Sequence, residues 1–234
     1  MYIAFLVILA VMFAIVPILD AFVFGGKKAE GAPIVSDKGK SKCKGYCSTM
    51  VYYLCFILPV IIMCIIGGIS FYDIGFSPIR FEQNIWFTII VIIVAVALFI
   101  YEFVIPVVSK SYRARLLEDE GEDIDELPQT NKEKWLYSFQ TLSSALCEES
   151  WYRGFLLFLL LTIFPGMPIF LIILIAFVTF AVGHVYQGVK SMVEVGLFGA
   201  LSMSLLIVTG SLIPSMLLHF FTDFVAVFMI RKRA

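Results

Sequence analysis

Charged side chains are scarce in this chain of 234 residues: Lys, Arg, Asp and Glu together make up 15% of it, whereas 61% is hydrophobic. Its mean hydropathy is +0.97. A soluble domain of this size does not carry that balance, so the composition excludes one and indicates an integral membrane protein. The sequence also lacks a basic patch of the kind that binds nucleic acid, and we expect no nucleic-acid partner.

The motifs of several enzyme classes are missing as well. No serine or cysteine stands beside a histidine in a recognisable nucleophile motif, and neither an HExxH sequence nor a glycine-rich phosphate loop occurs. The five cysteines form no CxxC pair, and the spacing of Cys43 and Cys47 suits neither a zinc knuckle nor a redox pair. If the protein catalyses hydrolysis, the expected nucleophile is therefore a water molecule.

Long apolar segments are abundant. A helix needs about 20 apolar residues to cross the hydrocarbon core of a bilayer. The chain offers seven such segments, at about 2–24, 49–70, 85–108, 136–163, 168–186, 192–209 and 211–230. The first is too long for a signal peptide and lacks a basic start and a small-residue cleavage site, so we expect it to remain as an anchor. The sequence thus predicts an all-α, polytopic bundle of about seven transmembrane helices.

Basic residues predict the orientation of this bundle. Six lysines lie between the first two segments, and further Lys and Arg residues lie in 110–134, at 190 and at 231–233. The connections on the opposite side carry one basic residue, Arg80. The positive-inside rule then places the N-terminus outside and the C-terminus inside. We expect a multi-pass protein of a prokaryotic-type cell membrane, with the acidic run 117–126 as a solvated cytoplasmic linker or, alternatively, a calcium or docking site.

Few ionisable residues interrupt the apolar segments. They are Asp20, Glu102, Glu148, Glu149, Arg153, His184, Glu194, His219 and Asp223. A charge at the bilayer centre costs about 2.5–3.5 kcal/mol on insertion scales. Three of these residues, Asp20, Glu102 and Glu194, lie near segment ends and can reach water or headgroups. The other six concentrate in the fourth, fifth and seventh segments, a clustering that indicates function.

Helical geometry separates the two adjacent glutamates. At about 100° per residue, Glu149 and Arg153 lie about 40° apart on a helix and form a natural ion pair. Glu148 lies about 140° from Arg153, so it faces another group. His219 and Asp223 are also four residues apart, and the carboxylate can accept a hydrogen bond that fixes the imidazole tautomer. Each feature alone is also compatible with a buried structural ion pair.

The fifth and sixth segments complete the pattern. Gly183 precedes His184 and permits the close approach of another backbone. Gly196, Ala200 and Ser204 form a small-residue face of the sixth segment, which we interpret as a packing surface between neighbouring helices. The last four segments should therefore bring a carboxylate, two imidazoles and a further carboxylate together.

Three kinds of chemistry suit this set. Glu148 and His184 could bind and deprotonate a water molecule, while His219 donates to the oxyanion formed at an amide carbonyl. Two imidazoles and a carboxylate also suit a catalytic zinc ion. A proton relay in a transporter is the third use. The residues alone leave these alternatives open.

Three short motifs resemble those of a known family. "EESWYR" fits the pattern EExxxR, "FAVGH" fits FxxxH, and "HFFTD" fits HxxxN/D, in that order. The sequence resembles the CPBP family of intramembrane proteases, which includes type II CaaX prenyl proteases and bacteriocin-processing, Abi-like proteins. "HVYQG" and "TGSLIPSMLLH" extend the resemblance, which covers residues 136–230, and "YDIGF" at 72–76 is a weaker similarity.

The resemblance implies roles for the six residues. Glu148 and His184 would activate water, His219 with position 223 would stabilise the oxyanion, and Glu149 and Arg153 would support the site. The best-studied form of the family has asparagine where this chain has Asp223, and an ionised aspartate has no hydrogen to donate. We therefore expect Asp223 to orient His219 unless Asp223 is protonated.

These observations predict a domain organisation and an activity. We expect N-terminal helices with cytoplasmic loops in 1–134 and a catalytic core in 135–234, with a water-filled cavity between the last four helices. The leading hypothesis is an endopeptidase that cuts peptides or membrane-associated proteins near the cytoplasmic half of the bilayer, with zinc as an open alternative and no other cofactor. The main alternative is a non-catalytic immunity or scaffold protein that retains the fold. A transporter would show inverted repeats or paired half-helices, and neither is visible. No residue selects among a prenylated tail, a bacteriocin leader and a pheromone as substrate.

Overall fold

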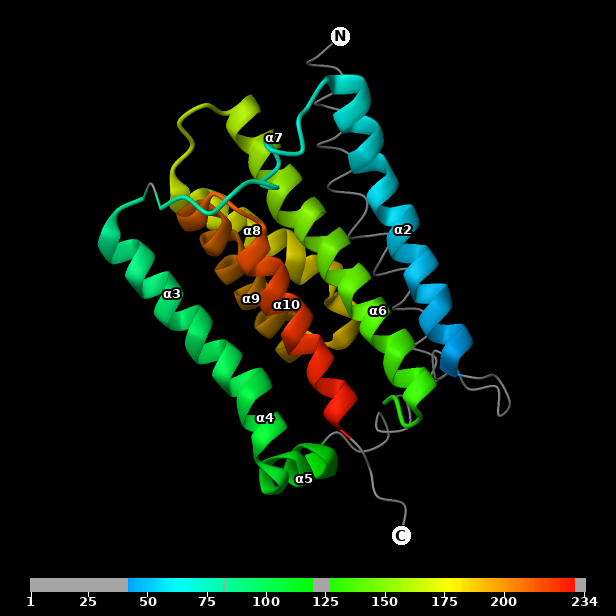
Figure 1. Ribbon diagram of the computed structural model, residues 1–234. Coiled ribbons are helices and arrows are strands. Elements are labelled where there is room, and N and C mark those ends of the chain that lie inside the picture. Colours follow the sequence, from blue (N-terminus) through cyan, green and yellow to red (C-terminus); the bar gives the residue numbers. More distant parts are fainter. Residues whose placement is uncertain (1–41, 82, 120–126, 230–234) are drawn as a thin grey trace.

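The computed structural model describes residues 42–81, 83–119 and 127–229 (Figure 1). These residues form helices and connecting loops, and no strand occurs among them. The all-α bundle predicted from the apolar segments is confirmed. The first expected span, 2–24, most of the acidic run and both chain ends lie outside the described residues. The orientation in the membrane stays a prediction.

The helices follow the apolar segments closely. They are α2 (Lys42–Gly67), α3 (Ile85–Phe99), α4 (Ile105–Val108), α5 (Lys110–Asp119), α6 (Asn131–Glu149), α7 (Leu156–Ile163), α8 (Ile169–Gly183), α9 (Val189–Thr209) and α10 (Ile213–Phe224). A π-helical turn joins α3 to α4, so helix is continuous over Ile85–Val108. This run, α2 and α9 are each long and apolar enough to cross a bilayer, and α8 and the run Ile213–Phe228 are shorter apolar helices.

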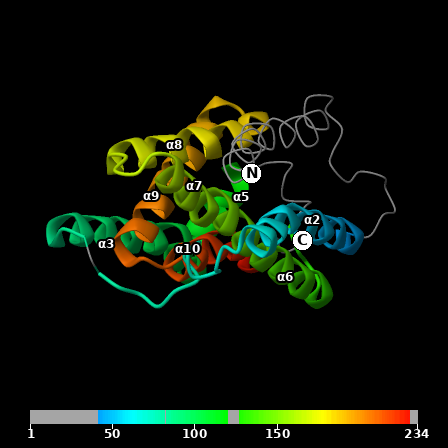
Figure 2. The same cartoon turned by 90° about the horizontal axis from the view of Figure 1, so that it is seen from above.

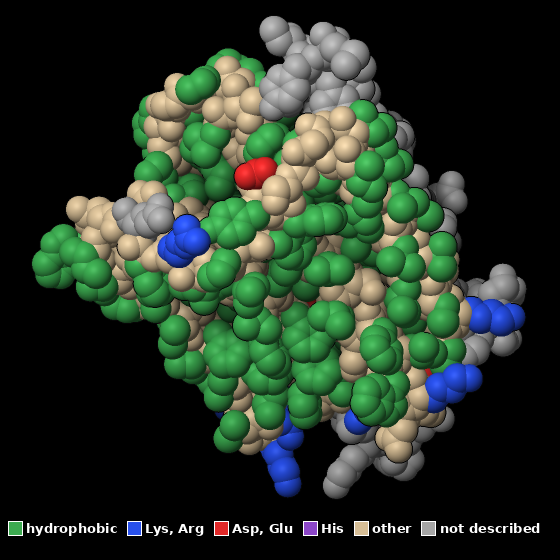
Figure 3. Space-filling model, turned by 45° about the horizontal axis from the view of Figure 1, so that its top comes forward, with side chains coloured by type: hydrophobic (Ala, Val, Ile, Leu, Met, Phe, Trp, Pro, Cys, Tyr) green, Lys and Arg blue, Asp and Glu red, His purple; other side chains and the backbone are tan. Residues whose placement is uncertain are grey.

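The helices pack around α6 and α10. Helix α2 lies against α6, α8 lies against α9, and α10 contacts both α6 and α9. The view from above shows α3 on one side of this group and α2 on the other (Figure 2). Hydrophobic side chains predominate on the face in Figure 3, with a few charged side chains among them. Apolar side chains as exposed as Ile65 (74%) and Trp86 (70%) are expected where lipid, rather than water, surrounds the protein.

Local sequence signals fix the start of α6 and the end of α9. Thr130 and Glu133 form a capping box at the start of α6: the Glu133 N–H donates to Thr130 Oγ1 (3.2 Å), and the Thr130 N–H donates to Glu133 Oε2 (3.0 Å). Helix α9 ends at Gly210, whose φ of 62° is left-handed and therefore favours glycine. These caps set where α6 and α10 begin, and with that the positions of the buried acids.

A π-helical segment, Ser150–Phe155, interrupts the α-helix directly after the two glutamates. Such insertions shift the phase of the following side chains and occur frequently at functional sites. All six of its residues are buried. A Cβ added at Gly154 would lie 2.1 Å from the carbonyl oxygen of Ile74, so the loop before α3 packs directly on this helix.

The same loop closes one end of the bundle. The Leu212 N–H donates to the Gly75 carbonyl (2.8 Å), the Arg80 N–H donates to the Thr209 carbonyl (2.7 Å), and the Ser77 hydroxyl donates to the Gly210 carbonyl. The turn between α9 and α10 is thereby tied to the loop between α2 and α3. This connection holds the start of α10, the helix that carries His219.

Candidate active site

Two adjacent glutamates end α6 inside the bundle. Glu148 is 8% exposed and Glu149 is fully buried. Glu149 Oε1 lies 3.3 Å from Arg153 Nη1, the pair indicated by their four-residue spacing. The same oxygen lies 3.0 Å from Nδ1 of His219 on α10. Glu149 therefore links the arginine on its own helix to a histidine 70 residues away, a connection that the sequence did not indicate.

The Arg153 guanidinium occupies an aromatic and acidic environment. Its side chain is fully buried, and its central carbon lies 3.9 Å from the Phe180 ring centroid on α8 and 5.9 Å from that of Phe198 on α9. A cation in low dielectric requires a partner, which Glu149 supplies, and the ring face adds a cation–π contribution. Arg153 thus holds Glu149 in place and connects α6 to α8 and α9.

His219 lies among three carboxylates. Its Nδ1 faces Glu149, and its Nε2 lies 3.9 Å from Oε2 of Glu148 and 3.6 Å from Oδ2 of Asp223. Only the contact to Glu149 has hydrogen-bond length. Glu149, rather than Asp223, therefore makes the hydrogen bond that orients the ring, and Asp223 is an electrostatic neighbour of Nε2. The Phe198 ring packs edge-on against the imidazole, with centroids 5.3 Å apart.

His184 follows the last residue of α8. The His184 N–H turns to the carbonyl of Ala181 (3.1 Å), so the carbonyl of Phe180 loses its usual helical donor. His184 Nδ1 lies 2.9 Å from that oxygen. When Nδ1 donates there, the neutral ring carries its lone pair on Nε2, the form required of a base or a metal ligand. His184 is within electrostatic range of both Glu148 and His219.

Glycines allow α8 and α9 to approach closely behind this site. A Cβ at Gly199 would lie 2.9 Å from Phe180 Cβ, and one at Gly196 would lie 2.8 Å from the Phe177 ring. Gly196 belongs to the small-residue face expected from the sequence, whereas Gly199 was not singled out. The close contact positions Phe180 between His184 and Arg153.

Metal-ligating side chains do not gather around a common point in the described part of the chain. No group of three or more His, Cys, Asp or Glu residues there has an arrangement that could hold a metal ion. The acids and imidazoles described above instead pair with one another, so the residues as placed do not fit a zinc centre.

A family comparison agrees with the motifs. Residues 130–225 match the model described as type II CAAX prenyl endopeptidase Rce1-like. This segment, which is less than half of the chain, resembles an Rce1-like domain. It supports a CPBP-type intramembrane protease, begins at the N-cap of α6 and contains all six candidate residues. Comparisons with curated proteins and with solved structures gave no match.

The match supports an intramembrane protease activity of the CAAX type for the matched segment. The buried Glu148, Glu149 and His219 are compatible with that activity.

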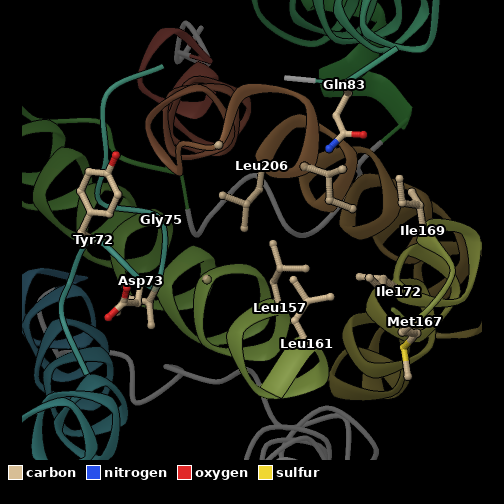
Figure 4. Close-up of a pocket in the computed structure, with 14 residues that line it drawn as sticks. Tyr72, Asp73, Gly75, Gln83, Leu157, Leu161, Met167, Ile169, Ile172 and Leu206 are labelled. Atoms are coloured by element: carbon tan, nitrogen blue, oxygen red, sulfur yellow. The ribbon is translucent and has the colours of Figure 1, made fainter. Parts of the chain in front are cut away.

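A pocket of about 310 Å³ lies between α7, α8, α9 and the loop that precedes α3 (Figure 4). Apolar side chains of α7, α8 and α9 surround it, including Leu157, Ile172 and Leu206, and Tyr72 and Asp73 stand at its edge. None of the six candidate residues lines it. The water-filled cavity expected around the catalytic residues stays a prediction.

Proposed function

We propose that this chain hydrolyses a peptide bond in a membrane-associated substrate, with a water molecule activated by Glu148 and His184. One observation carries the proposal: two helices bring a buried carboxylate, Glu148, and a carboxylate-bound imidazole, His219, within 3.9 Å of each other. Burying these groups is costly in a membrane unless they are used or paired. Glu149 and Arg153 already pair, so Glu148 remains for chemistry.

Glu148 is the proposed general base. The Ser144 hydroxyl donates to Oε1 (3.3 Å), and Oε2 faces the imidazole of His219. A water molecule held by Oε2 and the Nε2 lone pair of His184 loses its proton to Glu148 as its oxygen attacks the carbonyl carbon.

His219 is the proposed oxyanion donor. Its Nδ1 is directed at Glu149, so Nε2 carries a hydrogen only when the ring is an imidazolium. Three neighbouring carboxylates balance that charge. As the carbon–oxygen bond forms, negative charge develops on the carbonyl oxygen, and the Nε2–H stabilises it. The tetrahedral intermediate then collapses, the carbon–nitrogen bond breaks, and the leaving nitrogen takes the proton held by Glu148.

The family description supports a prenylated CaaX peptide as the first substrate to test. The positive loops and the apolar surface support a multi-pass position in the cell membrane. We propose cleavage near the cytoplasmic half of the bilayer, where such a tail would enter.

The test is cleavage of a quenched fluorescent, farnesylated CaaX peptide by the full-length protein in liposomes. Glu148→Gln should lower kcat by about 10²–10⁴-fold, the range for loss of a general base. Glu133→Gln is the control, because it changes a carboxylate of the same helix in the capping box, away from the site. Its kcat should stay within a few fold of the wild-type value. Full activity in Glu148→Gln would overturn the proposal. A non-catalytic role would instead survive Glu148→Ala combined with His184→Ala.

A further inference from the structure

Helix α2, which lies outside the Rce1-like domain, packs on α6. Near the start of the interface, the rings of Tyr46 and Tyr137 meet edge-on with centroids 5.4 Å apart. Further along, Phe56 contacts Trp151 with centroids 5.4 Å apart. The second pair lies ten residues further along α2 but 14 residues further along the helix that begins with α6, where the π-helical segment Ser150–Phe155 has replaced regular α-helix. Before that segment both helices are α-helical, so a step of seven residues from the Tyr46–Tyr137 pair keeps the same two faces in contact.

The residue one heptad after Tyr46 is Tyr53, and it stands opposite Ser144, one heptad after Tyr137. The phenol hydroxyl of Tyr53 is within hydrogen-bonding reach of Ser144 and of Glu148. Ser144 itself donates to Glu148 Oε1. Two hydroxyl groups, one from each helix, thus meet the same carboxylate.

We propose that Tyr53 is a positioning residue for the catalytic carboxylate, supplied by the N-terminal part of the chain. The inference rests on the proposed function of Glu148 as base. A carboxylate 3.9 Å from an imidazole is drawn toward it by charge. The hydroxyl donors Tyr53 and Ser144 hold Glu148 away from His219, so that its Oε2 can bind the water that it shares with His184.

Removing the hydroxyl but not the ring separates this role from packing. In Tyr53→Phe the α2–α6 interface keeps its aromatic ring, and Glu148 loses a donor that favours its ionised form. The acid limb of the kcat–pH profile should move to higher pH, and kcat should fall about tenfold with KM unchanged. Tyr46→Phe is the matched control because it removes a hydroxyl from the same interface one heptad away. It should change neither quantity.

A second readout does not depend on cleavage. Dicyclohexylcarbodiimide reacts with protonated buried carboxyl groups, and mass spectrometry can assign the label to Glu148. The labelling midpoint should move to higher pH in Tyr53→Phe and stay at the wild-type value in Tyr46→Phe. An unchanged midpoint in a folded Tyr53→Phe protein would overturn the inference, whatever the activity. If the midpoint moves but Glu148→Gln still cleaves the peptide, the proposed function fails and the contact of Tyr53 with Glu148 stands.

Discussion

The ion pair between Glu149 and Arg153 should dominate the stability of the site. Both side chains are fully buried, and the charged atoms lie 3.3 Å apart. With an effective dielectric constant of about 20, Coulomb's law gives an attraction of about 5 kcal/mol at this distance. Removal of one partner from a buried pair is measured to cost about 3–5 kcal/mol, because a charge is left uncompensated. The two partners are not equivalent, since Glu149 keeps His219 when the arginine is removed.

A double-mutant cycle measures this pair. Glu149→Gln should lower the free energy of unfolding by about 3–5 kcal/mol, and Arg153→Met should lower it by less. The double variant should be more stable than the sum of the single effects implies, with a coupling above about 1 kcal/mol. The assay is reversible unfolding in bicelles, compared with wild type. Effects that add to within about 0.5 kcal/mol would refute the reasoning, because independent sites behave in that way.

Three further predictions concern other parts of the domain. In a peptide-cleavage assay, Asp223→Asn should retain kcat to within about tenfold or raise it, because Asn can donate a hydrogen bond to the oxyanion. A loss of kcat as large as that of Glu148→Gln would contradict this prediction. Gly154→Ala should strongly lower the midpoint temperature of unfolding, because its Cβ would lie 2.1 Å from the Ile74 carbonyl oxygen. Thermal denaturation of the variant and the wild type would check this. Elemental analysis of the purified protein should find well below one zinc per chain, and chelators should leave cleavage unchanged; stoichiometric zinc would contradict the ligand geometry.

Local spacing predicted part of this site. The four-residue interval between Glu149 and Arg153 was enough to indicate their pairing, since side chains at that spacing share a helix face. The contact between Glu149 and His219 depends on how α10 packs on α6, which local spacing does not encode. Sequence reasoning therefore assigned the orientation of His219 to Asp223, its neighbour on the same helix, whereas Glu149 makes the hydrogen bond.

The start of α2 also could not be predicted from local sequence alone. The second apolar segment was expected to start at 49, but α2 begins at Lys42. Its polar first turns carry no hydropathy signal and are held by tertiary contacts, such as the bond from Lys42 Nζ to the Leu127 carbonyl (3.0 Å) and the Tyr46–Tyr137 ring pair. Tyr53 was not identified from the sequence either, because its proposed role depends on the helix that it faces.

The most direct test of the central claim is a single turnover of the farnesylated peptide in H₂¹⁸O, with the wild-type protein in excess over substrate. If Glu148 activates a water molecule, the new carboxyl group of the product gains one ¹⁸O atom. A product that carries only ¹⁶O would show that an enzyme oxygen attacked the carbonyl carbon, and it would contradict the role assigned to Glu148.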